Sequence, residues 1–375
     1  METKRYPFYL KSTVILFGLV LVVYVLFNLR DIFSTLAFAI IFSILLNPLV
    51  GWFQKKTVGR VAAIVFSMLI ALILVVSVVY FLSSQIAGLA ENLPLLKQKF
   101  IESLVQLQGW LQSHLGIKIG NPVEMLKKGL DNSQALVGKT VGSALGTLAV
   151  IFLLPVYIFM ILFYKPLILS FLYEVFAEAN SRQVNEILTQ TKSAIQSYMI
   201  GLLIEALIVA VLNSTALLIL GVEYAILFGV IGAILNMIPY IGGIVAIALP
   251  VLMATVTKDG FSTQLGIIIA YAVIQFVDNN ILVPRIVSSK VKINALVSIL
   301  IVLLGNALWG VPGMFLSIPT VAILKIIFDR VDGLKPWGRL LGDDVPTRHL
   351  GKRWAKRRGK SSVAEKMVGN EKKDE

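Results

Sequence analysis

Long apolar stretches separated by short polar segments make up most of this 375-residue chain. The first three are Ser12–Leu29, Asp31–Val50 and Val61–Ile86. Each approaches or exceeds the roughly 20 residues with which an α-helix crosses a bilayer. Because only two or three polar residues separate the first two stretches, we expect those two to form a hairpin. The first has no small-residue cleavage site after it, so we interpret it as a retained span and not as a signal peptide.

The middle of the chain alternates between polar and apolar character. In Glu91–Lys139, leucine and phenylalanine recur at steps of three and four, which predicts an amphipathic helix. Its apolar stripe packs on the protein's own membrane part, lies at the lipid interface, or forms an oligomer contact. Val141–Tyr164 is the fourth predicted span, Glu174–Gln196 is a second amphipathic segment, and Tyr198–Leu220 is the fifth span.

Two later apolar segments are too long for one ordinary span, and each is interrupted. Val222–Val256 contains the sequence Asn-Met-Ile-Pro-Tyr-Ile-Gly-Gly at 236–243, and Ile293–Phe328 contains Gly-Asn-Ala-Leu-Trp-Gly-Val-Pro-Gly at 305–313. Non-helical backbone at membrane depth is tolerated only where protein or a watery cavity covers it. Paired interruptions of this kind point to a transporter's substrate site. The alternative is a kinked helix without a ligand.

Basic residues favour a re-entrant arrangement of these two segments. If both crossed the membrane, the loop with Arg285, Lys290 and Lys292 would face outside, against the preference of basic residues for the cytoplasm. If both are re-entrant hairpins, this loop is cytoplasmic, and Gln264–Val283 is the sixth full span. We therefore expect an all-α polytopic membrane protein with six transmembrane helices, two re-entrant helical hairpins and both termini in the cytoplasm.

This organisation divides the chain into six parts. They are an N-terminal three-span region (1–90), an extracytoplasmic amphipathic insertion (91–140), a fourth span (141–173), a cytoplasmic amphipathic helix (174–198), a transport region with the two broken segments (199–331) and a basic cytoplasmic tail (332–375) that we expect to be disordered or bound to anionic lipid.

Composition supports the membrane assignment and excludes several chemistries. Hydrophobic residues make up 57% of the chain and charged residues 15%, which leaves too few polar residues to cover a soluble protein of this size. The net charge of +13 is concentrated beside apolar spans and in the tail, which indicates membrane topology and not nucleic-acid binding. There is no cysteine, and the two histidines lie far apart. We expect no cofactor, no metal site and no enzyme activity.

Polar residues near the broken segments are the candidate site. Asp278 and Asn279 lie at the end of the sixth predicted span, and Glu205 lies within the fifth. Acids inside a membrane are costly and are functional by default. The alternatives are an interfacial position for Asp278 and a polar packing partner for Glu205. We expect Asn236, Asn279 and Asn306 to bind a small solute or cation together with free backbone groups at the hairpin tips, where Pro239 stops the incoming half-helix and Gly242 and Gly243 reverse the chain.

These motifs resemble those of the autoinducer-2 exporter family of bacterial membrane proteins. The resemblance rests on the Pro-Tyr-Ile-Gly-Gly break at 239–243, the segment Gln275–Arg285 and the segment Gly305–Pro319, and it covers roughly Pro7–Val331. The positions that match the family's elements are Asn236, Pro239, Tyr240, Gly242, Gly243, Asp278, Asn279, Pro284, Arg285, Gly310 and Pro312. Of these, the resemblance assigns Tyr240 to the binding region. It assigns structural or hinge positions to Pro284, Arg285, Gly310 and Pro312.

The resemblance also implies a function and an assembly. It implies export of autoinducer-2 in some members, exchange of sodium or lithium for protons in others, and a homo-oligomer, a pentamer, with elevator-like movement of the hairpin region. It implies the cytoplasmic membrane of a bacterium. We accordingly expect a secondary transporter of a small polar solute. The alternatives are a sodium (lithium)/proton antiporter, with Glu205 or Asp278 as the titrating group, and a non-transporting membrane scaffold.

The topology can be tested by cysteine labelling, because the chain has no native cysteine. The hairpin arrangement predicts that a membrane-impermeant maleimide applied outside intact cells labels Thr257→Cys and leaves Ser288→Cys unlabelled until the membrane is permeabilised. The reverse pattern would indicate eight complete spans.

Overall fold

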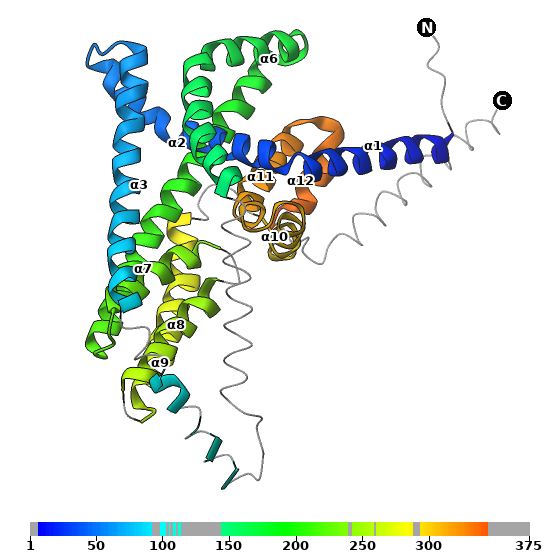
Figure 1. Cartoon of the computed structure of the whole chain (residues 1–375). Helices are drawn as coiled ribbons and strands as arrows, with labels where there is room; N and C mark the ends of the chain where they lie inside the picture. Colours follow the sequence, from blue (N-terminus) through cyan, green and yellow to red (C-terminus); the bar gives the residue numbers. More distant parts are fainter. Residues whose placement is uncertain are drawn as a thin grey trace, which may run out of the picture.

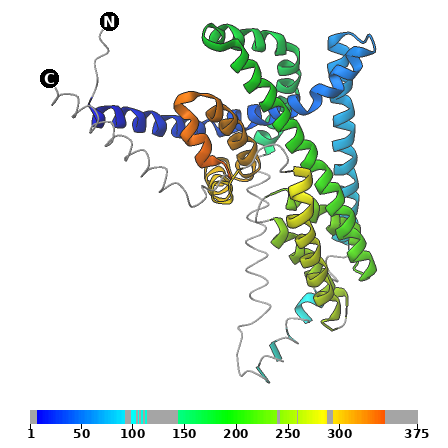
Figure 2. The same ribbon diagram turned by 180° about the vertical axis from the view of Figure 1, so that it is seen from behind.

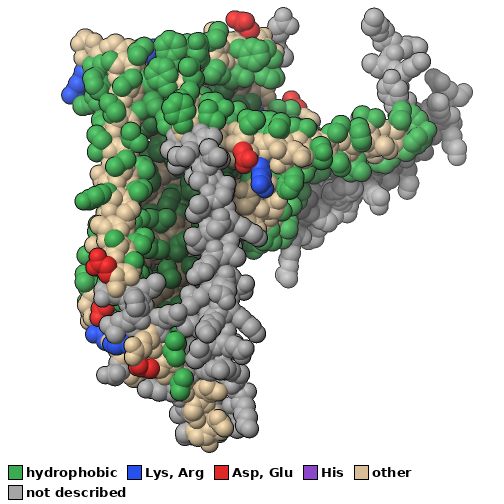
Figure 3. Space-filling model, in the orientation of Figure 1, with side chains coloured by type: hydrophobic (Ala, Val, Ile, Leu, Met, Phe, Trp, Pro, Cys, Tyr) green, Lys and Arg blue, Asp and Glu red, His purple; other side chains and the backbone are tan. Residues whose placement is uncertain are grey.

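The described part of the chain is helical throughout and contains no strand. This computed structural model describes residues 7–91, 98–102, 105, 108–109, 112–113, 144–238, 242–258, 260–287 and 293–343. Seven helical segments among these residues are long and apolar enough to cross a membrane. Hydrophobic side chains cover most of the described surface visible in Figure 3. An all-α polytopic membrane protein is therefore confirmed.

The N-terminal helices differ from the predicted hairpin. Helix α1 (Phe8–Asn28) and helix α2 (Arg30–Lys55) meet at Leu29 and continue in nearly the same direction (Figures 1 and 2). Backbone bonds bridge the junction, since the Leu29 N–H donates to Val25 at 2.9 Å and the Phe33 N–H donates to Leu29 at 3.0 Å. The prediction of a hairpin here was wrong. The polar residues at the junction neither include glycine or proline nor interrupt the helical hydrogen bonds, so the chain does not reverse.

The chain reverses after α2 and again within α6. Helix α3 (Arg60–Glu91) runs back along the molecule from the turn that follows α2 (Figure 1). Helix α6 (Ala144–Ile219) has two long arms, Phe152–Phe176 and Arg182–Ile219, joined by a bend. The predicted amphipathic helix at 174–198 is thus part of α6 and not a separate helix. No glycine or proline separates it from the fifth predicted span, so the helix continues.

Both interrupted segments form helical hairpins. Helices α7 (Ala225–Asn236) and α8 (Gly242–Thr257) pack together, as do α10 (Ala295–Trp309) and α11 (Val311–Arg330). At about 1.5 Å per residue, α7, α8 and α10 are only about 18 to 24 Å long, whereas a bilayer core is about 30 Å thick. Three of the four arms are therefore too short to span a bilayer alone.

Helix α9 (Ser262–Val277) follows the first hairpin and continues into a π-helix, η1 (Asp278–Val287). The first hairpin, α9 and the second arm of α6 surround one buried cluster that includes Phe228, Ala254, Ile267 and Leu217. A second cluster joins α2, α3 and the first arm of α6. The first of these clusters positions the candidate site.

The beginning of the tail is ordered, in contrast to the expected disorder of 332–375. A 3₁₀ turn (Asp332–Leu334) leads into helix α12 (Lys335–Leu341). Asn294 ties α12 to the start of α10: its side-chain oxygen accepts from the Val297 N–H at 2.8 Å, and its amide donates to the Leu340 carbonyl at 2.7 Å. Residues 344–375 and most of the insertion at 91–140 lie outside the described residues, so those predictions are untested.

The second hairpin depends on two glycines that face each other. A Cβ on Gly313 would lie 1.9 Å from the Gly305 carbonyl oxygen, and a Cβ on Gly305 would lie 2.4 Å from the Gly313 carbonyl oxygen. The backbones of α10 and α11 are therefore in direct contact at these two positions, and a residue with a Cβ does not fit at either of them.

We predict that Gly313→Ala separates these arms and lowers the free energy of unfolding by about 1–3 kcal/mol, as overpacking typically does. Thermal unfolding in detergent measures the change. Gly333→Ala is the matched control, because no atom lies within 4 Å of a Cβ at that position. Equal melting temperatures for the two variants would contradict the close contact.

Candidate functional site

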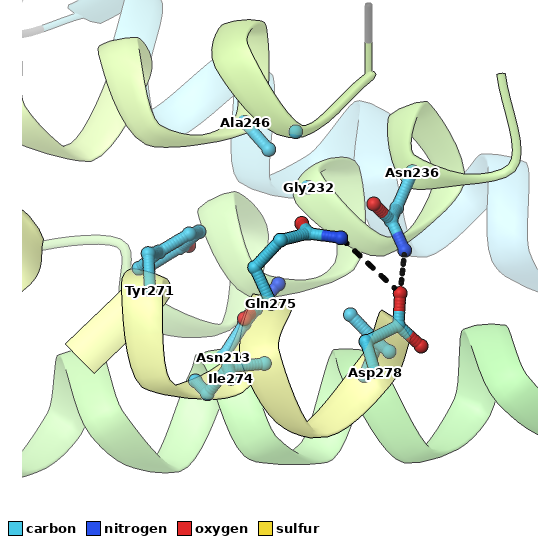
Figure 4. A pocket seen from close by; sticks show the side chains of 10 residues that line it. Asn213, Gly232, Asn236, Ala246, Tyr271, Ile274, Gln275 and Asp278 are labelled. Atoms are coloured by element: carbon cyan, nitrogen blue, oxygen red, sulfur yellow. Dashed lines mark hydrogen bonds between the residues drawn. The ribbon is translucent and has the colours of Figure 1, made fainter. Parts of the chain in front are cut away.

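Two buried carboxylates share one amide at the centre of the C-terminal half. The Asn236 side-chain nitrogen donates to Asp278 Oδ2 at 2.9 Å and lies 3.5 Å from Glu205 Oε1. Asp278 is 2% exposed and Glu205 is 6% exposed. The amide of Gln275 also donates to Asp278 Oδ2, at 3.4 Å (Figure 4). The sequence proposed these two acids separately, and the fold brings them together.

Regular helical spacing places polar side chains on the facing surfaces of several helices. In α6, Glu205, Val209 and Asn213 recur every four residues, which puts them on one face. In α9 and η1, Tyr271, Gln275 and Asp278 recur at steps of four and three, which also puts them on one face. Asn236 completes the arrangement as the last residue of α7, beside the break in the first hairpin. The site thus joins the hairpin to the long arm of α6 and to α9.

A small cavity lies between these side chains. Its lining residues are Val209, Asn213, Gly232, Asn236, Gly243, Ala246, Tyr271, Ile274, Gln275 and Asp278 (Figure 4). The cavity has about the size of one water molecule. In this conformation the cavity is large enough for one water molecule or one dehydrated ion at most, and a larger solute needs the helices to separate.

Three polar atoms of this lining are buried and have no hydrogen-bond partner within the described residues: Asn213 Oδ1, the Tyr271 hydroxyl and Asp278 Oδ1. A buried polar group without a partner costs roughly 1–3 kcal/mol, and a membrane protein has no bulk water at this depth to offset that cost. All three belong to residues that line the cavity. A species bound there would be coordinated by oxygen atoms.

Glycines at the break bring the hairpin close to the acids. A Cβ on Gly242 would lie 1.8 Å from the Leu235 carbonyl oxygen, so only glycine allows α8 to begin this close to the end of α7. A Cβ on Gly243 would lie 2.9 Å from Gln275 Oε1. These contacts explain sterically why positions 242 and 243 are glycines. Pro239 and Tyr240, which were also predicted, lie outside the described residues.

The π-helix begins at Asp278 itself. Wider helical turns of this kind are rare and occur frequently at functional sites. Pro284 lies within η1 and cannot donate a backbone hydrogen bond, and the Asn280 amide donates to the Phe276 carbonyl at 2.8 Å. The sequence signal for this irregular backbone is the proline that follows three consecutive polar residues.

The remaining predicted residues lie at varying distances from the acids. Asn279 is exposed but linked to the cluster, since the Gln275 amide donates to its oxygen at 3.3 Å. Asn306 is exposed on α10 and does not line the cavity, so the structure does not bring it to this site. Arg285 is exposed in η1, and Gly310 and Pro312 form the turn of the second hairpin, where Gly310 has φ +65°.

Three polar lining residues, Asn213, Tyr271 and Gln275, were not among the predicted site residues. Each lies on the helix face of a predicted acid: Asn213 is eight residues after Glu205, and Tyr271 and Gln275 are seven and three before Asp278. This spacing is the signal by which they can be found.

We predict that Asn236→Leu destabilises the protein by about 1–3 kcal/mol, because both carboxylates lose their shared donor. Asp278→Asn in the same background removes a buried charge and should restore part of the loss. Thermal unfolding in detergent measures both effects. Asn280→Leu makes the same replacement at an exposed position, and a melting temperature as low as that of Asn236→Leu would contradict the shared contact.

Comparison with known proteins identifies the family of this chain. Residues 13–333 match the family described as AI-2E family transporters. The AI-2 transport protein TqsA of Escherichia coli K12 is 26% identical over 338 residues, which cover 89% of this chain and 96% of TqsA. YhhT from the same strain, provisionally named as a transport protein, is 26% identical and covers 85% of this chain and 90% of its own length. YrrI of Bacillus subtilis, also provisionally named so, is 25% identical and covers 80% of this chain and 86% of its own length. This multi-pass membrane protein belongs to the AI-2E transporter family.

Proposed function

We propose that this protein is a secondary transporter that binds a small polar solute at Glu205, Asn236 and Asp278. The observation that carries the proposal is the pair of buried carboxylates around one amide, directly beside a broken hairpin. Membrane proteins place such acids where a solute or ion is bound, because an unneeded buried charge costs several kcal/mol.

Autoinducer-2 is the first solute to test, because the relative TqsA is named as an AI-2 transport protein. The carboxylates would accept hydrogen bonds from hydroxyl groups of a solute, and the amides of Asn213, Asn236 and Gln275 offer both donors and acceptors. The water-sized cavity then corresponds to a closed state, in which the solute has left or has not yet entered.

Transport would proceed by displacement of the first hairpin against the second arm of α6. Asn236 lies on the hairpin, whereas Glu205 belongs to α6. An elevator-like movement of the hairpin region would therefore break and re-form the Asn236–Glu205 contact, and would open the cavity to one side of the membrane at a time. The same proposal includes a homo-oligomer in the bacterial cytoplasmic membrane.

Exchange of a monovalent cation for protons is the second candidate. Two observations favour it: the cavity has the size of one water or small ion, and none of the ion pairs in the described part of the chain involves Glu205 or Asp278. Two acids without a basic partner need protons or a bound cation to be stable in an apolar setting. One pair could serve both functions if a cation drives the movement of the solute.

Flux measurements in proteoliposomes test both candidates. We predict that Glu205→Gln and Asp278→Asn each reduce autoinducer-2 flux at least tenfold while the oligomer keeps its size-exclusion profile. For cation exchange, sodium should collapse an imposed pH gradient with the wild-type protein and not with Asp278→Asn.

Asn280→Ala is the control, since its amide bonds only a backbone carbonyl outside the cluster. Normal flux in both acid variants would refute the site. Absence of flux with every solute in the wild-type protein, together with a stably bound partner protein, would favour the membrane scaffold instead.

A further inference from the structure

Three basic side chains gather where α2, α3 and the two arms of α6 meet. Arg60 is the first residue of α3, and Lys165 and Lys192 belong to the two arms of α6. Lys192 lies one helical turn before Gln196, whose amide donates to the Ile44 carbonyl of α2 at 2.8 Å, and Lys165 donates to Asn47, one turn further along α2. In Figure 3, basic side chains are visible at the corner of the molecule where α2 turns into α3.

Neutral contacts hold two of the three side chains in place. An Arg60 guanidinium nitrogen donates to the Leu162 carbonyl at 3.1 Å and also to the Phe163 carbonyl, and the guanidinium lies 5.5 Å from the Phe163 ring centre. The Lys165 ammonium donates to Asn47 Oδ1 at 2.8 Å. Since a guanidinium has five N–H donors and an ammonium three, both groups keep donors free for a ligand.

The cluster lacks a compensating acid within the described residues. The ion pairs there are Arg30–Asp31, Arg182–Glu186, Lys325–Asp329, Arg330–Glu186 and Lys335–Asp332, and none includes Arg60, Lys165 or Lys192. Like charges gathered on adjoining helices repel one another, and a bound anion would reduce that repulsion.

Aromatic and apolar residues around the cluster indicate its depth in the bilayer. Trp52 and Tyr164 are about half exposed, and the Lys56 ammonium lies 3.8 Å from the centre of the Trp52 ring. Tryptophan and tyrosine concentrate at the headgroup level of membranes. Exposed apolar side chains follow on the adjoining helices, for example Phe66 and Leu167, at 48% and 65% exposure. The surroundings therefore suit a ligand with an anionic head and acyl chains.

We propose that Arg60, Lys165 and Lys192 form a binding site for the phosphate of an anionic phospholipid in the cytoplasmic leaflet. The occupant is the lipid and not free phosphate, because the cluster adjoins exposed apolar helix surface at the aromatic belt. A bound headgroup would connect α3 to both arms of α6. It would thereby hold the N-terminal helices against the bend of α6, away from the hairpin that contains Asn236. This site is separate from the acid cluster and does not depend on which solute is transported.

Native mass spectrometry of the detergent-solubilised full chain, titrated with phosphatidylglycerol or phosphatidylcholine, tests the proposal. We expect phosphatidylglycerol to bind more tightly than phosphatidylcholine. At about a fivefold contribution for each basic residue near a membrane surface, Lys192→Gln should weaken phosphatidylglycerol binding about fivefold, and Lys165→Gln/Lys192→Gln about 30-fold. Lys192→Gln leaves the contacts of Arg60 and Lys165 intact, so a folding defect is not expected to obscure its effect.

Lys258→Gln is the matched control, because Lys258 is an exposed lysine in the distant loop between α8 and α9. It should leave phosphatidylglycerol binding unchanged. The proposal is overturned if the double variant binds phosphatidylglycerol as the wild type does, or if Lys258→Gln weakens binding equally. It is also overturned if inorganic phosphate at equal concentration displaces the lipid, since that result would indicate a site for the free anion.

Discussion

The contact between the Asn236 amide and the carboxylates of Asp278 and Glu205 is the interaction on which the C-terminal half depends. In an apolar setting, an acid stays ionised only if a hydrogen-bond donor or a cation stabilises it, and otherwise it takes up a proton. Each of the three residues comes from a different helical element. The need of the two carboxylates for a hydrogen-bond donor thus fixes where α7, η1 and the second arm of α6 meet. A species bound between the carboxylates would therefore change the relative position of these three elements.

The broken hairpins follow from the same need for close and polar packing. Asn236 reaches the acids because α7 ends there, and α8 begins directly beside that end only because residue 242 is a glycine. The second hairpin uses Gly305 and Gly313 in the same way, with its backbones in contact. It has no corresponding acid pair among the described residues, and Trp309 at its turn donates instead to the Leu26 carbonyl of α1 at 2.9 Å. The two hairpins are alike in construction and differ in chemistry.

Sequence patterns predicted the helical class, both hairpins, and the participation of Asn236 and Asp278 in a common region, because apolar length and glycine or proline breaks are local properties. They did not predict that Glu205 and Asp278 share a donor, since that depends on the packing of segments more than 70 residues apart. Asn213 and Tyr271 were missed although their helical spacing from these two acids is visible in the sequence. Asn306 was predicted as a site residue because, like Asn236, it is a polar residue beside a break. In the structure its side chain is exposed and does not line the cavity. The hairpin expected at Leu29 was wrong because polar residues alone do not end a helix.

The central claim is that a transported species binds between Glu205 and Asp278. Modification of these carboxylates by a hydrophobic carbodiimide, followed residue by residue with mass spectrometry, tests it most directly. We expect autoinducer-2 or sodium, whichever the protein transports, to slow modification at Asp278 and Glu205 and to leave that at Glu91, near the end of α3, unchanged. Modification of the two buried acids at the same rate with and without the transported species would contradict the account.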